Sequence, residues 1–421
     1  MNGFFRGLQL AALSGIVLTF LLAGCGGGGN DGNDGNGGND SNAPSAVVQP
    51  LTLPGPYAVA CSNIAQDFSG VADEEDAKSY WEGTGHYVTD LLTDPDNTLI
   101  ATVTAPMDSD LYGEFAGQSV PFVVIVCYPT TADNSRLDYP LPTGDVVPHM
   151  QTGSEPPLFA DASARYPVVV FSDGFGDSPI SSEDYISVLS ILASYGYVVI
   201  APFHGDFRFS DLNIDNLGDA IEVASNLENF TAMQALRPLS ISAALTLVLD
   251  HPQWQDHIDA TQIGGFGVSM GGETMMLLGG AGLTTSYLDI GASWKQVTHD
   301  TRIKAAVGYV PYFGQPVLPA FGHHQDGLEG INLPFLGISG TADTTAPINE
   351  TEIGMSRLTG PRRLVALSGV MHEFDVASKN DIFTWTLTFL DAEVRGTLEA
   401  ITRLYTMGSV AGGGDDSVRL Y

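Results

Sequence analysis

The stretch IGGFGVSMGGETMMLLGG, residues 263–280, decides the fold. An apolar run ends at Ser269, which stands between Gly267 and Gly271, and a segment rich in helix formers follows. This order predicts a strand, a sharp turn and a helix. Such a turn projects the serine hydroxyl into a cleft and leaves the next N–H, that of Met270, free to stabilise an oxyanion. The pattern therefore predicts Ser269 as a nucleophile, and the alternative is a tight turn without chemistry.

Apolar, β-branched runs alternate with segments of helical spacing on both sides of this stretch. The expected strands lie at 97–106, 120–129, 166–172, 197–203, 263–268, 303–311, 334–340 and 363–369. The expected helices lie at 183–194, 237–250, from 271 onward, 381–391 and 394–404. This alternation predicts an α/β fold with a mostly parallel central sheet, an antiparallel N-terminal strand pair and helices on both faces. The stretches 205–236 and 310–333 fit no regular element, and we expect them to be substrate-binding loops.

A serine hydroxyl needs a histidine base that is oriented by a carboxylate. The turn resembles that of α/β-hydrolase sheets, and this resemblance implies that the acid and then the histidine follow on later strands. Of the nine histidines, only His372 follows a late strand. Asp343 directly follows the strand before that one and is the expected acid, with Glu350 and Glu352 as alternatives. The expected catalytic set is therefore Ser269, His372 and Asp343.

The loop SDGFG, residues 172–176, follows an early central strand and is expected to supply the second oxyanion donor. Its glycines let backbone amides approach a ligand closely, and the Phe175 N–H is the expected donor beside that of Met270. In the 310–333 stretch, Tyr312, Phe313 and Phe321 are expected to contact the substrate. The alternative for these three rings is ordinary packing within the loop.

Several stretches together resemble one superfamily. They are YPVVVFSDGFG, YVVIAPFHGD, RPLSISAALTLVLD, GGFGVSMGG, GISGTADTTAP and VMHEF. From about residue 111 to 390 the chain resembles the α/β-hydrolase superfamily. It is most similar to the branch with dienelactone-hydrolase-like proteins, platelet-activating-factor acetylhydrolases and cutinase-type or polyester-degrading esterases. The resemblance implies an α/β-hydrolase fold, a Ser-His-Asp triad and no metal or organic cofactor.

Two residues depart from the pattern of that branch. Its members commonly have His-Gly in the oxyanion loop, where this chain has Asp173 and Gly174. A carboxylate near a developing oxyanion is unfavourable unless it points away or is paired. Dienelactone hydrolases proper use a cysteine nucleophile, whereas this chain has Ser269, so we do not expect that reaction.

The combined motifs predict a serine carboxylester hydrolase that forms an acyl-enzyme. The chain has 49 Asp and Glu against 16 Lys and Arg, a formal net charge of −33. This balance argues against a nucleic-acid partner and favours neutral esters over anionic ones. We expect short- or medium-chain esters, polyesters included, as substrates and a monomeric enzyme. The alternatives are a phospholipase A2-like acetylhydrolase directed at lipids, a peptidase, and a surface lipoprotein that binds a ligand without turnover.

The N-terminus is typical of an exported, lipid-anchored protein. Residues 1–24 hold a long apolar run and end in Leu-Ala-Gly before Cys25, which resembles the bacterial lipobox. Acyl chains on Cys25 would provide a stable membrane anchor, and the Gly-, Asn- and Asp-rich residues 26–44 predict a flexible tether. Gly26 favours the outer membrane of a bacterial envelope, with a secreted form if the anchor is lost. An ordinary secretory signal is the alternative.

The chain is therefore expected to have four parts. They are a signal peptide over 1–24, a lipidated Cys25 with tether over 25–50, an N-terminal extension over 51–110 and a catalytic domain over 111–421. Outside the cell disulfides persist. Cys61 and Cys127 are accordingly either a disulfide or two separately buried thiols.

Overall fold

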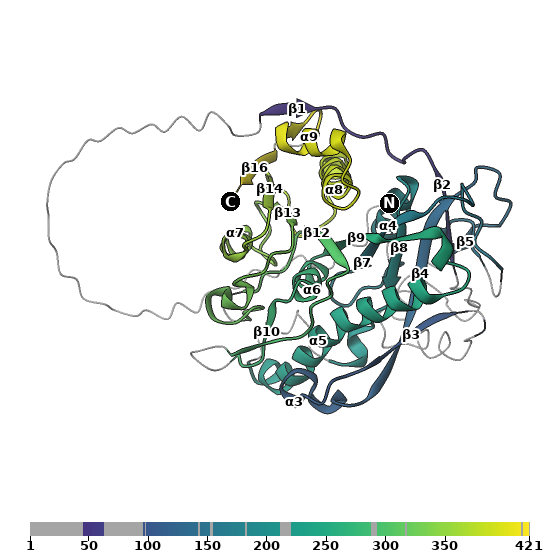
Figure 1. Ribbon diagram of the computed structural model, residues 1–421. Coiled ribbons are helices and arrows are strands. Elements are labelled where there is room, and N and C mark those ends of the chain that lie inside the picture. The colour runs from purple at the N-terminus through teal and green to yellow at the C-terminus, as the bar shows by residue number, and fades with distance from the viewer. Residues whose placement is uncertain are drawn as a thin grey trace, which may run out of the picture. The chain divides into compact units, whose positions relative to one another are not determined.

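The computed structural model describes most of the chain from Ser45 onward (Figure 1). The described residues are 45–62, 96, 98–141, 144–151, 155–181, 183–210, 220–287, 293–315, 318–413 and 416–420. The expected signal peptide, Cys25 and residues 26–44 lie outside them, as do residues 63–95 of the expected extension. The described residues form one compact unit.

A central sheet of ten strands organises the described residues. Its parallel part has the order β14 (Arg362–Leu367), β13 (Phe335–Gly340), β12 (Ile303–Tyr309), β9 (Ile258–Val268), β7 (Tyr166–Ser172) and β8 (Val198–Pro202). Antiparallel strands flank it: β16 (Asp416–Leu420) pairs with β14, and β4 (Ser119–Thr130) pairs with β8. The two halves of β4 also pair with β3 (Leu99–Thr104) and β2 (Ala58–Ser62). The fold is thus mixed α/β with a mostly parallel central sheet.

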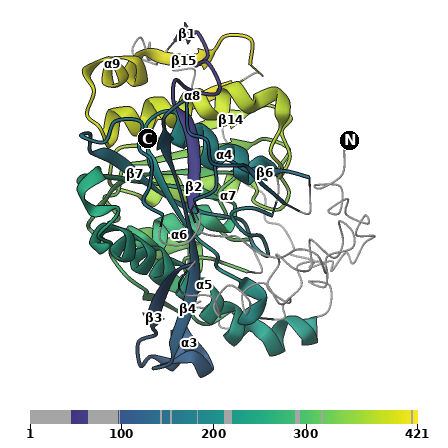
Figure 2. The ribbon, with the colours of Figure 1, turned by 90° about the vertical axis from the view of Figure 1, so that its right-hand side faces the viewer.

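Helices cover both faces of this sheet (Figure 2). On one side pack α4 (Glu183–Ser194), α8 (Lys379–Glu393) and α9 (Leu398–Thr406). On the other pack α5 (Ala220–Asp250), α6 (Met270–Leu278) and α7 (Ile348–Arg357). Successive side chains of a strand point to opposite faces, so in β7 Val168 and Val170 face α5 and α6 while Val169 and Phe171 face α4 and α8. Each such fully buried side chain contributes roughly 1.5–3 kcal/mol.

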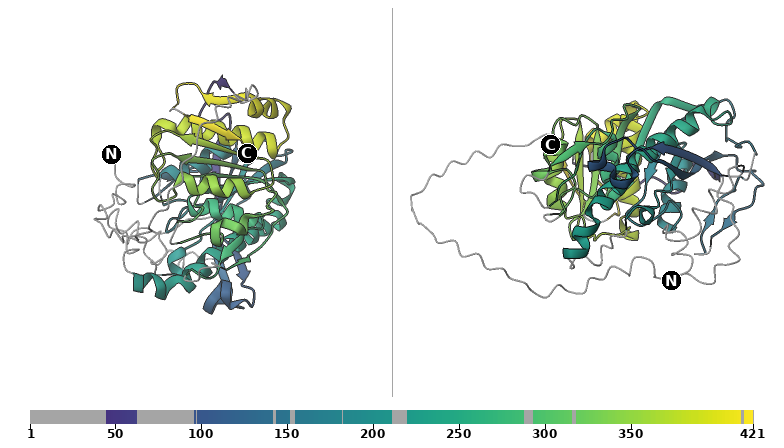
Figure 3. Two further views of the ribbon diagram at one scale, coloured as in Figure 1. Left: turned by 90° about the vertical axis from the view of Figure 1, so that its left-hand side faces the viewer. Right: turned by 90° about the horizontal axis from the view of Figure 1, so that it is seen from below.

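Short elements complete the described part of the chain, which Figure 3 shows from two further sides. The two-stranded pairs are β1 (Ala46–Val48) with β15 (Met407–Val410), β5 (Tyr139–Pro140) with β6 (Val146–Val147), and β10 (Gly282–Thr284) with β11 (Trp294–Gln296). The short helices are α3 (Ser109–Tyr112), η2 (Gly113–Phe115), η3 (Asp206–Arg208), η5 (Gln255–His257), η6 (His323–Leu328) and η7 (Val376–Ser378).

Helix α5 corrects the expectation of a loop over 205–236. Residues 220–236 form its first half, and Pro238 lies inside the helix instead of at its start. Proline is favoured in the first turn of a helix, which made Pro238 resemble an N-terminus. Buried side chains such as Phe230 and Met233 hold the first half on the core, and this packing overrides the local preference. In the described chain, 226–250 is also long and apolar enough to cross a membrane, but most of that segment is buried in the body.

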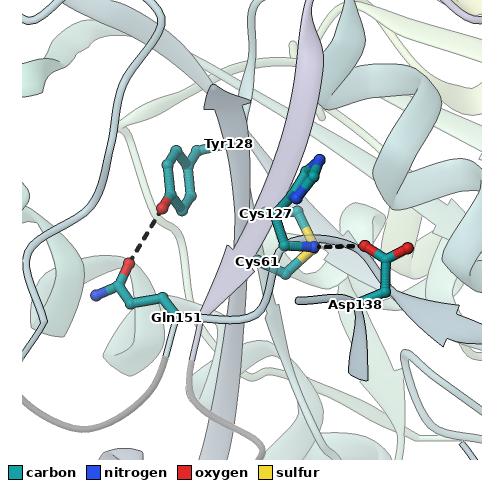
Figure 4. Close-up of a disulfide and its surroundings, with 6 residues drawn as sticks. Cys61, Cys127, Tyr128, Asp138 and Gln151 are labelled. Atoms are coloured by element: carbon teal, nitrogen blue, oxygen red, sulfur yellow. Dashed lines mark hydrogen bonds between the residues drawn. A yellow bond between two sulfur atoms is a disulfide. The ribbon is translucent and has the colours of Figure 1, made fainter. Parts of the chain in front are cut away.

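Cys61 and Cys127 form a disulfide (Figure 4). The two residues lie directly opposite each other on the antiparallel strands β2 and β4, with their Cα atoms 4.0 Å apart. Of the two sequence alternatives, the structure therefore has the bond. It fixes the edge strand β2 to the sheet across a sequence separation of 66 residues.

Candidate active site

Ser269 occupies a sharp turn between β9 and α6. Its backbone has φ 53° and ψ −115°, a conformation that a residue with a Cβ adopts only under strain. A Cβ on Gly267 would collide with the main chain of Gly271, and one on Gly271 would collide with the Ser172 carbonyl. Both glycines are therefore required by close backbone packing. The Ser269 N–H donates to the Tyr309 carbonyl over 2.9 Å, which anchors the turn on β12.

His372 lies between Ser269 and Asp343. Its Nε2 is 2.9 Å from the Ser269 Oγ, and its Nδ1 is 2.7 Å from Asp343 Oδ2. The Asp343 side chain is buried, and its Oδ1 accepts hydrogen bonds from the Thr345 and Ala346 N–H groups at 2.9 and 2.8 Å. This network fixes the carboxylate, which in turn orients the imidazole so that Nε2 can accept the serine proton.

The alternative acids lie elsewhere. Glu350 and Glu352 are on α7, and the Glu350 carboxylate accepts a hydrogen bond from Gln325.

Among the other histidines, His204 is buried, and its two ring nitrogens contact Ser172 Oγ and Ser240 Oγ. Burial and the nearby Arg237 hold its pKa well below the ordinary value, so His204 is a neutral part of the core.

The loop after β7 passes directly beside the nucleophile. A Cβ on Gly174 would lie 3.8 Å from the Ser269 Cβ. The Gly174 N–H donates to the Tyr185 hydroxyl on α4 over 3.2 Å. Within the described part of the chain, neither the Phe175 N–H nor the Met270 N–H has a hydrogen-bond acceptor. The two free donors thus lie on the two segments that adjoin the serine, the loop after β7 and the start of α6.

Asp173 points away from the nucleophile into a buried cluster. One of its oxygens is 4.0 Å from His204 Nε2, and the other is 4.0 Å from Arg237 Nη2. Neither oxygen has a hydrogen bond in the described structure. Burial raises the pKa of this carboxyl well above the ordinary value, although Arg237 opposes the shift. Burial therefore favours the neutral form of the Asp173 carboxyl, which lies in the cluster with His204 and Arg237.

Sequence reasoning missed the rest of this cluster. Arg237 on α5 is fully buried and forms an ion pair with Asp206 at 2.5 Å. Glu273, one turn after the nucleophile on α6, accepts a hydrogen bond from Gln234, and burial raises its pKa to about 8. The only signal was a set of charged residues in otherwise apolar stretches, and such residues are rarely buried unless paired.

The three aromatic residues expected at the substrate take different positions. The Tyr312 N–H donates to the Ser269 carbonyl, so its main chain lies at the turn. Phe313 and Phe321 are buried and pack against each other, and Phe313 also packs against Phe335. Their rings belong to the core, as the packing alternative had it.

The cavities lined by described residues include two of different size. The smaller, about 260 Å³, adjoins the loop that carries His372 and is lined by Asp184, Ser187, Phe374, Asp375, Val376, Lys379 and Phe383. The larger, about 460 Å³, lies near the end of α6 and the starts of β12 and β13, at the opposite edge of the sheet from Ser269. The larger of these two cavities therefore lies away from the candidate site, and the smaller one adjoins it.

Nothing in the described residues gathers three His, Cys, Asp or Glu side chains as a metal site would. No protein-family model matches the chain, and no curated protein matches it. The case for a function therefore rests on the motifs and on the geometry of this site.

Proposed function

We propose that this chain is a serine carboxylester hydrolase with the α/β-hydrolase fold. The observation that carries the proposal is the continuous contact from Ser269 Oγ through His372 to Asp343, with 2.9 and 2.7 Å separations. A nucleophile, a base and an acid in this arrangement are recognised by geometry and roles rather than by sequence position. The free N–H groups of Phe175 and Met270 beside the serine add support.

The reaction proceeds through an acyl-enzyme. His372 Nε2 accepts the Ser269 proton as Oγ attacks the ester carbonyl, and Asp343 stabilises the imidazolium that forms. The N–H groups of Phe175 and Met270 donate to the oxyanion of the tetrahedral intermediate. The alcohol leaves with the proton from His372. The neutral imidazole then activates water, which releases the acid and restores the serine.

Neutral short- or medium-chain esters, including polyesters, are the proposed substrates. A net charge of −33 repels anionic substrates at moderate ionic strength. We place the enzyme in a bacterial cell envelope, anchored through lipid on Cys25, where it would meet esters too large to enter the cell. Turnover of an acetylated phospholipid in preference to a soluble ester would instead favour the lipid-directed alternative.

Hydrolysis of p-nitrophenyl esters by purified protein tests the proposal. Wild-type protein should release p-nitrophenol, and Ser269→Ala should lose about 10⁶-fold in kcat because nucleophile and base act as a unit. Ser163→Ala is the matched control, since Ser163 is an exposed serine ahead of β7 whose hydrogen bonds within the described structure are to Asp161. Full activity in Ser269→Ala would exclude the proposed mechanism.

A further inference from the structure

The two free N–H groups beside Ser269 belong to different elements. Phe175 is on the loop after β7, and Met270 begins α6. An oxyanion hole works only when both donors are held about 2.7–3.1 Å from the place where the oxyanion forms. Other residues must therefore fix the position of the loop after β7 relative to α6.

The Arg237 guanidinium contacts both elements. Its Nη2 donates to the carbonyl of Asp173, at the start of the loop. Its Nε donates to the Thr274 Oγ1 over 3.3 Å, and that hydroxyl donates to the Met270 carbonyl over 3.0 Å. One side chain thus connects the main chain of both donor-bearing segments.

Asp206 holds the other end of the same loop. Its Oδ2 accepts the Gly176 N–H over 2.9 Å and also accepts from Arg237 Nη1 over 2.5 Å. The Asp206–Arg237 pair therefore brackets Phe175, with a contact to the main chain on each side of it.

Stability alone does not explain this pair. Both side chains are almost completely buried, and a buried ion pair is often no more stable than well-packed apolar residues of the same volume. What apolar residues could not supply is the fixed planar fork of donors that Arg237 directs at the loop, at Asp206 and at Thr274.

We infer that Asp206 and Arg237 are positioning residues that hold the Phe175 and Met270 N–H groups on one oxyanion. This inference rests on the proposed function, because it assigns a role within that reaction. The pair touches no reacting atom and acts through the main chain of the loop and of α6.

Kinetics of Asp206→Asn test the assignment. Asparagine keeps the shape and an oxygen for the Gly176 N–H but removes the charge that holds Arg237. We expect kcat for a p-nitrophenyl ester to fall about 10–100-fold with KM changed less than about threefold, because the donors act on the transition state. The inhibition constant of phenylboronic acid, which forms a tetrahedral adduct with serine, should rise by a similar factor.

Arg237→Lys is a second variant, which keeps the positive charge but removes the planar fork of donors. It should also lower kcat while KM changes little. Asp300→Asn is the matched control: Asp300 also pairs with an arginine, Arg302, and accepts a hydrogen bond from Ser242 on α5, away from the loop. It should change thermal stability at most, with kcat unchanged.

Two outcomes would overturn the inference, and they differ. In the first outcome, wild-type protein turns over esters, and the folded variants Asp206→Asn and Arg237→Lys keep kcat within about threefold of it. The pair then has no positioning role, and the proposed function stands. If folded wild-type protein neither turns over esters nor binds phenylboronic acid, the proposed function falls and this role falls with it.

Discussion

Two polar regions adjoin Ser269, the catalytic triad and the buried cluster. They differ in the solvent exposure and in the hydrogen bonding of their side chains. In the triad, Asp343 accepts three hydrogen bonds and the His372 side chain is 18% exposed. In the buried cluster, Asp173 and Glu273 are almost completely inaccessible, and three of their four carboxyl oxygens lack a hydrogen bond among the described residues. In the triad, His372 is thus hydrogen-bonded through both ring nitrogens and partly exposed, while the buried Asp343 carboxylate is hydrogen-bonded through both oxygens. The carboxyl groups of the cluster are buried, and burial favours their neutral forms by raising the pKa of both Asp173 and Glu273.

Among the variants that test this comparison, Asp343→Asn should lower kcat the most. An asparagine at this position favours the wrong imidazole tautomer and cannot stabilise the imidazolium, so kcat should fall about 10⁴-fold with little change in fold. Steady-state ester hydrolysis and circular dichroism on the same preparation measure the two quantities.

Glu350→Gln is the control for that variant. Glu350 was one of the two alternative acids in the sequence, and its carboxylate on α7 accepts a hydrogen bond from Gln325. Its replacement should leave kcat within about threefold. Equal losses in the two variants would contradict the assignment of Asp343 to His372.

Glu273→Gln should have a smaller effect. It should change how the free energy of unfolding depends on pH. The pKa of Glu273 is about 8 in the folded protein and near the ordinary value of 4.5 when unfolded, so the folded chain binds the proton more tightly. The free energy of unfolding should therefore fall as pH rises from about 4.5 to 8. Glutamine keeps the contact with Gln234 and cannot ionise, so the variant should be more stable than wild type at pH 9 by more than about 1 kcal/mol.

Urea unfolding of both proteins at pH 5 and pH 9 measures this difference. Part of the decline should remain in the variant, because burial also raises the pKa of Asp173. If the free energy of unfolding declines equally in both proteins from pH 5 to pH 9, Glu273 does not differ in protonation between the folded and unfolded chain.

The mixed α/β fold and its mostly parallel sheet were predictable from the sequence because the central strands are continuous apolar runs. β7 and β13 lie where their residues indicated, and Ser269, Asp343 and His372 were expected because each follows such a strand. The first half of α5 was not predictable, since tertiary packing stabilises it and Pro238 suggested a boundary. The short edge strand β16, with polar residues such as Asp416 and Ser417, carries too little pattern to be recognised.

The buried cluster shows a different limit. Asp206 and Arg237 are 31 residues apart in sequence, and no local pattern marks their ion pair. Their pairing follows from the crossing of α5 over the ends of β7 and β8, which only the folded chain reveals. Sequence reasoning thus found the residues that follow strands and missed those that join elements.

Labelling with a fluorophosphonate probe tests the central claim most directly. The account predicts one covalent adduct on the folded wild-type protein, mapped by mass spectrometry to the peptide that contains Ser269. The adduct should be absent from Ser269→Ala and should form more slowly in Asp343→Asn. An adduct that persists in Ser269→Ala, or folded wild-type protein that takes up no probe, would contradict the account.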